Sequence, residues 1–231
     1  ISTMKRSKIN QVIEDGMRFI ESQHFHLPDF AYWKPEDFKG KREEYDEVFT
    51  NMLGWDVTDF GYDDFDNVGL LIFTLRNGSV LHSDVYPKPY CEKLLIVEDG
   101  QKLAPHYHYK KMEDIINRGG GNAIITLWEK NDHDGYSDKA VTVTMDGRKI
   151  TVPAGGSVTM KPGQSITLMP GQYHEIACEP GSGKLLLGEV STVNDDNIDN
   201  HFIEPSDRIP EVEEDCAPTY LIFKDYPDYV D

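Results

Sequence analysis

Hydrophobic and polar residues follow two different periods along the chain. From Lys8 to Gln23 the apolar residues fall mostly at intervals of three and four, which is typical of an amphipathic helix. Residues 24–62 are rich in aromatic, proline and charged residues, and they show no clean period beyond a short helix predicted near 41–50. We therefore expect the chain to open with a helix, followed by an arm that wraps over the core.

Beyond residue 68 the pattern becomes that of β-strands, with about ten short apolar segments separated by turn residues. The dipeptides Asn77-Gly78 and Asp146-Gly147 are favoured in two-residue hairpins because both positions tolerate positive φ. Within 141–145, valine and methionine alternate with threonine, as a sheet with one buried face requires. The predicted strands are Leu70–Arg76, Val80–Val85, Lys93–Val97, Ala123–Glu129, Val141–Met145, Arg148–Val152, Ser157–Met160, Ser165–Leu168, His174–Cys178 and Leu185–Val193. Such a succession predicts an antiparallel sandwich or barrel.

The chain contains no internal repeat and no low-complexity linker, so its 231 residues are predicted to form one domain. The expected parts are an N-terminal helix and arm (1–67), a β-barrel core (68–193) and an acidic C-terminal segment (194–231). That last segment contains twelve acidic and two basic residues. Its net charge of −10 is more than half of the total of −18. We interpret most of these acids as a solvated cover.

The charge and the cysteines exclude several classes of protein. The chain has 41 acidic and only 23 basic residues, which excludes a protein that binds nucleic acid by neutralising phosphates. No apolar run approaches the roughly 18 residues of a membrane helix, and the start of the chain lacks the apolar core of a signal peptide. We therefore expect a cytoplasmic enzyme without nucleic-acid or membrane partners. Cys91, Cys178 and Cys216 show no C-x-x-C spacing, which argues against a disulfide framework and a thiolate zinc site.

The segment that carries chemistry contains two histidines at alternate positions. His106 and His108 would point to the same face of a strand. Glu113 follows at odd spacing, so a turn or bulge at 109–112 is needed before its carboxylate can join them. His174 can supply a third imidazole. An isolated H-x-H pair is weak evidence, but three imidazoles and one carboxylate suit Mn²⁺, Fe²⁺, Co²⁺, Ni²⁺ or Zn²⁺ and leave positions open for a substrate.

Around these histidines the chain resembles the cupin superfamily. The first cupin motif is matched at every position by Gly100-x5-His106-x-His108-x4-Glu113-x6-Gly120. The second motif is matched in part: Gly163, Gly171 and His174 stand where expected, but Met169 replaces the usual Pro and Cys178 the usual Asn. The resemblance implies a mainly β fold, a cupin double-stranded β-helix barrel whose mouth can hold a ligand.

A narrower resemblance covers nearly the whole chain. It is carried by Phe30-Ala31-Tyr32-Trp33-x-Pro35-Glu36-Asp37, Glu92-Lys93, and the segments at 110–121 and 188–196. These segments are similar to those of bacterial D-lyxose isomerases, which are manganese-dependent cupin enzymes that interconvert D-lyxose with D-xylulose and D-mannose with D-fructose. The resemblance implies a sugar as substrate, a homodimer, and one Mn²⁺ per chain. The metal ligands that it implies are His106, His108, Glu113 and His174.

Aldose–ketose isomerisation moves a proton between C2 and C1 through a cis-enediolate, and it needs a cation to stabilise the charge and a positioned base. One of the adjacent residues Lys110 and Lys111 is expected to be solvated. Strand parity cannot choose between them because the bulge breaks it, and the family resemblance favours Lys111. As the catalytic carboxylate we choose Glu204, because its apolar neighbours Phe202 and Ile203 indicate a segment that docks on the barrel mouth.

Three further charged residues are candidates for binding the sugar. Lys93 and Glu189 each adjoin an apolar strand, where a charged residue either reaches the end of the sheet or lines a polar cavity. Arg118 either binds sugar hydroxyls or ties down the glycine-rich loop that follows it. Two other functions stay open: an Fe²⁺ cupin dioxygenase, which uses the same kind of ligand set, and a non-catalytic sugar-binding cupin.

Overall fold

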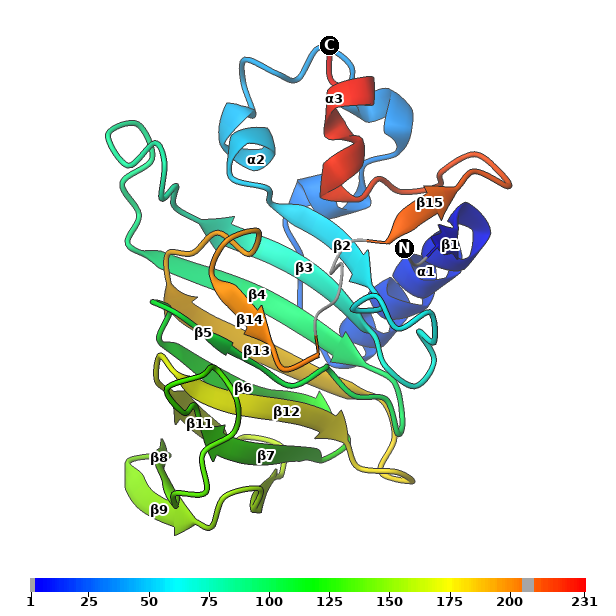
Figure 1. The fold of residues 1–231 in the computed structure, drawn as a ribbon. Helices are drawn as coiled ribbons and strands as arrows, with labels where there is room; N and C mark the ends of the chain where they lie inside the picture. Colours follow the sequence, from blue (N-terminus) through cyan, green and yellow to red (C-terminus); the bar gives the residue numbers. More distant parts are fainter. Residues whose placement is uncertain (1–2, 205–209) are drawn as a thin grey trace.

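The computed structural model describes residues 3–204 and 210–231, and within these ranges two antiparallel sheets face each other in a barrel (Figure 1). In spatial order, the larger sheet contains β2 (Gly54–Thr58), β3 (Leu70–Asn77), β4 (Tyr90–Val97), β13 (Leu185–Thr192), β6 (Glu113–Gly120), β11 (Ser165–Leu168), β8 (Val141–Met145) and β9 (Arg148–Val152). The smaller sheet contains β10 (Ser157–Met160), β7 (Ala123–Glu129), β12 (Gln172–Cys178), β5 (His106–His108) and β14 (Asn200–Phe202). Consecutive strands often lie in different sheets, so distant parts of the sequence meet inside the barrel.

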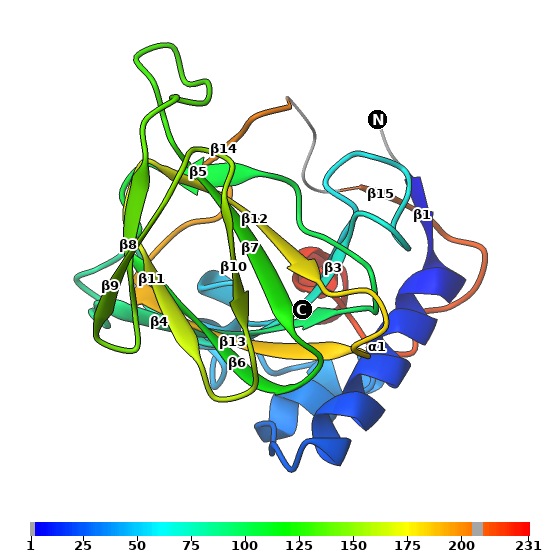
Figure 2. The ribbon, with the colours of Figure 1, turned by 90° about the horizontal axis from the view of Figure 1, so that it is seen from below.

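The central strands of the larger sheet are buried on both faces. In β3, Leu70 and Ile72 belong to the cluster inside the barrel, whereas Leu71 belongs to the cluster on the outer face. Helix α1 (Arg6–Ser22) covers that outer face (Figure 2). Its Gly16 allows a close approach, because a Cβ there would lie 2.2 Å from Leu71 Cδ2. The predicted opening helix is thus confirmed.

The two ends of the described chain pack together beside the barrel. Strand β1 (Thr3–Lys5) pairs in parallel with β15 (Glu211–Glu213). The guanidinium of Arg6, which is only 2% exposed, forms ion pairs with Asp225 at 2.9 Å and Glu214 at 2.6 Å. Since a buried guanidinium needs such partners, these ion pairs join the first helix to the C-terminal segment.

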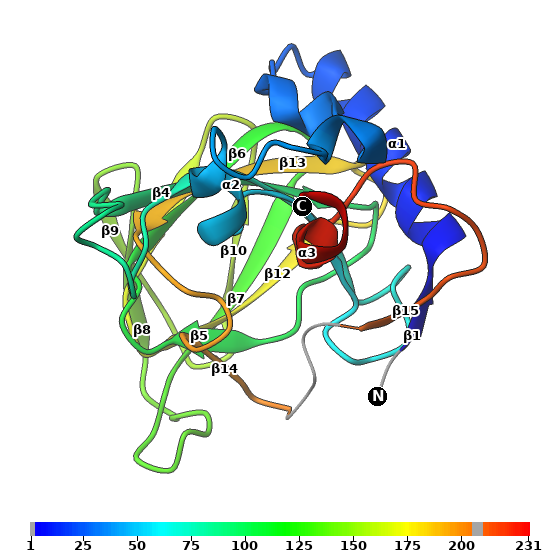
Figure 3. The ribbon, with the colours of Figure 1, turned by 90° about the horizontal axis from the view of Figure 1, so that it is seen from above.

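Short helices complete the cover. They are η1 (Asp29–Tyr32), η2 (Pro35–Phe38), α2 (Asp46–Thr50), η3 (Phe223–Asp225) and α3 (Tyr226–Tyr229). Helix α2 is the short helix predicted near 41–50, and its Val48 and Phe49 share a buried cluster with Tyr226 of α3, on the side of the barrel that faces the viewer in Figure 3. Both β2, which precedes residue 68, and β14, which follows residue 193, belong to the sheets of the barrel. Among the described residues, no helix combines the length and apolar character that crossing a membrane requires.

One predicted hairpin is confirmed and the other is wrong. Asp146 and Gly147 have φ values of 48° and 83° and connect β8 to β9, as their sequence predicted. The segment Val80–Val85 is not a strand, because β3 pairs with β4 and residues 78–89 form the loop between them. Within that loop Leu81 is 73% exposed and finds no neighbouring strand among the described residues.

Candidate functional site

The barrel brings the four predicted metal ligands together from both sheets. His106 and His108 lie on β5, and His174 lies opposite His106 on the neighbouring strand β12. The ligand atoms of these three histidines all lie within 4.8 Å of one another. Glu113 begins β6 in the other sheet, and its Oε1 lies 3.3 Å from His108 Nε2 and 3.2 Å from His174 Nε2. The chain turns at 109–112, as the odd spacing required.

Backbone carbonyls fix the orientation of each imidazole. The Nδ1 atoms of His106, His108 and His174 lie 2.8, 3.3 and 3.0 Å from the carbonyl oxygens of Ala104, Asp199 and Gln172. A carbonyl only accepts hydrogen bonds, so each Nδ1 carries a proton, and in the neutral imidazole Nε2 then presents a lone pair. Burial, and then the neighbouring imidazoles of His174 and His108, lower the pKa of His106 well below its usual value. A neutral imidazole is the form that binds a metal ion.

The resulting set of acceptors fits a divalent cation. The Nε2 of His174 is buried without a hydrogen-bond partner among the described residues, and it faces the Glu113 carboxylate. Two acceptors at this separation repel each other unless a cation lies between them. The observed separations resemble the roughly 3 Å expected between two ligand atoms that are each about 2.1 Å from one ion. Imidazole nitrogen and carboxylate oxygen together suit Mn²⁺, Fe²⁺, Co²⁺, Ni²⁺ or Zn²⁺.

A chain of buried charges continues from Glu113 into the cavity. Lys111 Nζ lies 3.1 Å from Glu113 Oε2 and 3.1 Å from Glu189 Oε2. Lys93 Nζ in turn lies 4.0 Å from Glu189 Oε2 and 2.6 Å from Asp196 Oδ2. Lys93 and Glu189 are therefore brought to the same place as Lys111, on the paired strands β4 and β13.

The members of this row of buried ion pairs keep one another charged. Burial opposes the charge of Lys111, but Glu113 and Glu189 outweigh it, so the pKa of the ammonium is raised well above its usual value. Burial likewise opposes the charge of Glu113, but Lys111 and His108 outweigh it and lower its pKa well below the usual range. Lys110, the neighbour of Lys111, is exposed. Of the two adjacent lysines, only Lys111 has its ammonium beside the candidate metal centre.

Most of these charged side chains line a cavity of about 400 Å³, counting the space that is open to solvent. Polar lining residues are His106, His108, Lys93, Lys111, Glu189, Asp196 and Asn200. The apolar side chains of Phe60, Leu103 and Phe202 form another part of its wall. A cavity that combines apolar walls with a few convergent polar groups is typical of a small-molecule site.

Glu113 and His174 lie behind the lining residues, whereas two other predicted residues lie apart from the site. Arg118 is exposed on β6, where its side chain lies over Gly188. Glu204 is exposed and is not among the residues that line the cavity. Its catalytic role stays a prediction, while Glu189 supplies a buried carboxylate beside Lys111.

The sequence did not single out two acids that help to build the site. Asp199 accepts hydrogen bonds from the backbone N–H groups of Lys110 and Lys111 at 2.9 and 3.0 Å, and it thereby holds the turn at 109–112. Asp196 holds Lys93, as described above. Both belong to the acidic segment after β13, where composition alone does not distinguish buried acids from solvated ones.

Comparison with known proteins agrees with this geometry. The model of the D-lyxose isomerase family matches residues 4–226. The chain belongs to the D-lyxose isomerase family. The D-lyxose/D-mannose isomerases of Serratia proteamaculans and Escherichia coli O157:H7 are 44% and 42% identical to it over 224 residues, which cover 96% of this chain and 98% of each relative. This membership confirms the predicted family and the prediction that the chain is an enzyme, a sugar isomerase.

Solved structures of similar fold confirm the predicted fold class. The L-ribose isomerase of Acinetobacter sp. DL28, in complex with L-ribose, covers 92% of this chain with a TM-score of 0.62. That of Cellulomonas parahominis covers the same share with a TM-score of 0.61. In both comparisons 99% of the other chain is covered and the sequences are 14% identical, so the likeness shows the cupin-type β-barrel alone.

Proposed function

We propose that this member of the D-lyxose isomerase family is a metal-dependent aldose–ketose isomerase, which interconverts D-lyxose with D-xylulose and D-mannose with D-fructose. The observation that carries the proposal is the convergence of three imidazoles and the Glu113 carboxylate beside the buried ammonium of Lys111. The names of the two relatives support the choice of sugars.

His106, His108, Glu113 and His174 would hold one divalent ion, for which we propose Mn²⁺. When bound, the ion would supply Lewis-acid stabilisation of the negative charge that develops on the sugar oxygens. The carbonyl contacts of the three Nδ1 atoms keep the imidazoles in the tautomer that this role needs.

The remaining chemistry falls to Lys111 and Glu189. We propose that Glu189 removes the proton from C2 and returns it at C1, because it is the buried carboxylate beside the ammonium that is not a proposed metal ligand, and it is only 7% exposed. Lys111 would donate a hydrogen bond to the sugar oxygens as they acquire charge. Lys93 would fix the position of Glu189, because its own ammonium is held by Asp196. Glu204 remains a second candidate for the proton transfer. Formation of D-xylulose by variants of Glu189 and of Glu204 distinguishes the two.

The family match favours the isomerase over an Fe²⁺ dioxygenase or a non-catalytic sugar-binding protein. A cytoplasmic homodimer remains a prediction from the family resemblance.

The test is an assay of the protein after removal of its metal by a chelator. We expect no turnover of D-lyxose until Mn²⁺ is added back, and then formation of D-xylulose under argon. The variant His106→Ala is expected to retain no metal and to stay inactive after the addition. If no divalent metal restores formation of D-xylulose or D-fructose, the proposed function is wrong.

A further inference from the structure

Asp199 is a buried acid that contacts two parts of the candidate site at once. Its two carboxylate oxygens accept the backbone N–H groups of Lys110 and Lys111, at 2.9 and 3.0 Å. Its backbone oxygen lies 3.3 Å from Nδ1 of His108. Asp199 is 8% exposed, and it is not among the residues that line the cavity. Any effect that it has on the chemistry therefore passes through the groups that it holds.

The carboxylate fixes the backbone that directs Lys111. Because a peptide unit is planar, two successive N–H groups that point at one carboxylate fix the two planes on either side of the Lys110 Cα. The next N–H group, that of Met112, donates to Thr192 Oγ1 at 3.3 Å and fixes the plane that follows Lys111. With the planes on both sides of its Cα fixed, Lys111 directs its side chain inward, whereas that of Lys110 is exposed.

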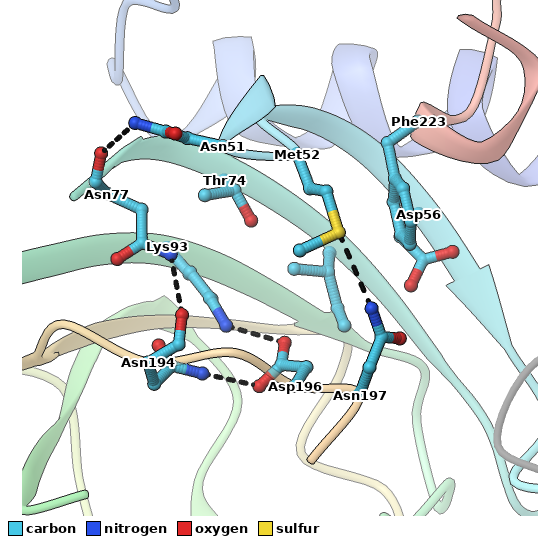
Figure 4. Close-up of a pocket in the computed structure, with 11 residues that line it drawn as sticks. Asn51, Met52, Asp56, Thr74, Asn77, Lys93, Asn194, Asp196, Asn197 and Phe223 are labelled. Atoms are coloured by element: carbon cyan, nitrogen blue, oxygen red, sulfur yellow. Dashed lines mark hydrogen bonds and ion pairs between the residues drawn. The ribbon is translucent and has the colours of Figure 1, made fainter. Parts of the chain in front are cut away.

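The turn that carries Asp199 is itself anchored at the other end of the row of buried ion pairs. The backbone N–H of Asp199 donates to the backbone oxygen of Asp195 at 3.0 Å. Within this turn, Asp196 accepts from Lys93 Nζ at 2.6 Å and from Asn194 Nδ2 at 2.7 Å (Figure 4). One turn thus holds one lysine of the row by its ammonium and the other by its backbone.

The two contacts at the turn at 109–112 require a carboxylate. A carboxylate offers two acceptor oxygens and no donor, so it satisfies both N–H groups together. An amide at the same place would offer one oxygen and would turn its NH₂ group toward the second N–H group. An ionised acceptor also forms a hydrogen bond roughly twice as strong as a neutral one. The acid at position 199 is therefore suited to hold this backbone in one conformation.

We propose that Asp199 is a positioning residue for the isomerisation: its carboxylate places the ammonium of Lys111 against the sugar oxygens. The inference rests on the proposed function, which gives Lys111 its role at those oxygens. A misplacement of about 1 Å costs up to about 10²-fold in rate. The contact with His108 uses the backbone oxygen of Asp199, and Asn200 pairs with His108 on the neighbouring strand, so the imidazole keeps its place when the carboxylate is removed.

The first test removes the carboxylate. We expect Asp199→Asn to lower kcat for D-lyxose about 10- to 100-fold and to leave KM within about threefold. Its affinity for Mn²⁺, measured by calorimetry, should stay near wild type. Asp199→Ser is a second variant, which places no NH₂ group against the backbone and should also lower kcat. Asp195→Asn is the matched control, because Asp195 Oδ1 accepts the N–H of Asn197 at 2.9 Å in the same turn, away from Lys111, and its kcat should stay near wild type.

A double-mutant cycle tests whether Asp199 acts through Lys111. In the Lys111→Met background there is no ammonium to place, so Asp199→Asn should lower kcat no further, whereas the losses of two independent groups multiply. Three results would overturn the proposal. They are wild-type kcat in both Asp199→Asn and Asp199→Ser, losses that multiply in the double variant, and an affinity for Mn²⁺ that falls in step with kcat.

A second cycle needs no turnover and uses the midpoint of urea unfolding in the presence of a chelator. We expect Asp199→Asn to lower this midpoint less in the Lys111→Met background than in the wild type, because only the wild type has a buried ammonium to misplace. Equal shifts in the two backgrounds overturn the proposal. If the shifts differ as expected but the wild type isomerises no sugar, the placement of the ammonium by Asp199 stands and the proposed function falls.

Discussion

The buried ammonium of Lys111 offers the sharpest perturbation of the site. Its side chain is 2% exposed, and its Nζ lies 3.1 Å from a carboxylate oxygen of both Glu113 and Glu189. Lys111→Met keeps the length of the side chain and removes the charge, which leaves two buried carboxylates facing each other. Removing one partner of a buried ion pair lowers the free energy of unfolding by about 3–5 kcal/mol. For a chain of this size, each kcal/mol lowers Tm by roughly 2–4 °C.

The loss of stability should depend on metal. In the metal-free protein the Glu113 charge in Lys111→Met has no compensating cation, so the full loss is expected. With Mn²⁺ bound at the histidines, the ion replaces part of the missing positive charge, and the variant should recover part of its Tm. Turnover should nevertheless remain about 10²–10⁴-fold below wild type, because the ion does not replace a proton donor at the sugar oxygens.

The assays are urea unfolding with chelator and with Mn²⁺, metal content by atomic absorption, and formation of D-xylulose. Lys110→Met is the matched control: it removes the same charge from the exposed neighbour, so stability and turnover should both stay near wild type. A Lys111→Met enzyme with wild-type turnover would remove Lys111 from the mechanism. An unchanged unfolding free energy in the metal-free state would refute the charge balance argued for the cavity.

Two further predictions concern the carboxylates and the cover. Glu189→Gln should keep its bound metal and lower turnover about 100-fold or more, whereas Glu204→Gln, at an exposed position, should stay near wild type; the reverse result in the D-xylulose assay would make Glu204 the catalytic carboxylate. Arg6→Met should lower the free energy of unfolding by about 3–5 kcal/mol, because Asp225 is buried and would lose its cation. Urea unfolding measures this, and a change below about 1 kcal/mol would contradict the role given to that ion pair.

Local sequence patterns were sufficient to predict many strands of the barrel. Strands β7 to β11 coincide with predicted segments because alternation and tight turns are encoded by neighbouring residues. Val80 and Leu81 look like a strand by the same criterion, yet strand formation also needs a partner, which local sequence does not supply. Strand β2 was missed although Trp55 and Val57 alternate with Asp56 and Thr58, because this run is short and lies within a segment rich in aromatic and charged residues. In the folded chain all five of its residues are buried.

The candidate site was predictable where the spacing was informative. His106 and His108 share one face of a strand by geometry alone, and the odd offset of Glu113 required the turn that is present. The choice between Lys110 and Lys111 depends on where that turn directs each side chain, and this is fixed by Asp199, about 90 residues away. Contacts of this kind form only in the folded barrel, so neither Asp199 nor its neighbour Asp196 had a signal among the acids of the C-terminal segment.

The central claim is that the site moves a proton between C2 and C1 of an unphosphorylated sugar. It is tested most directly by incubating the Mn²⁺-loaded protein with D-lyxose in D₂O under argon and analysing the sugars by mass spectrometry and NMR. We expect D-xylulose that carries deuterium at C1, formed without oxygen, and little or none from His106→Ala. Failure to form D-xylulose, a requirement for oxygen, or D-xylulose that still contains no deuterium after prolonged equilibration, when a proton held on Glu189 has had many turnovers in which to exchange with solvent, would contradict the account.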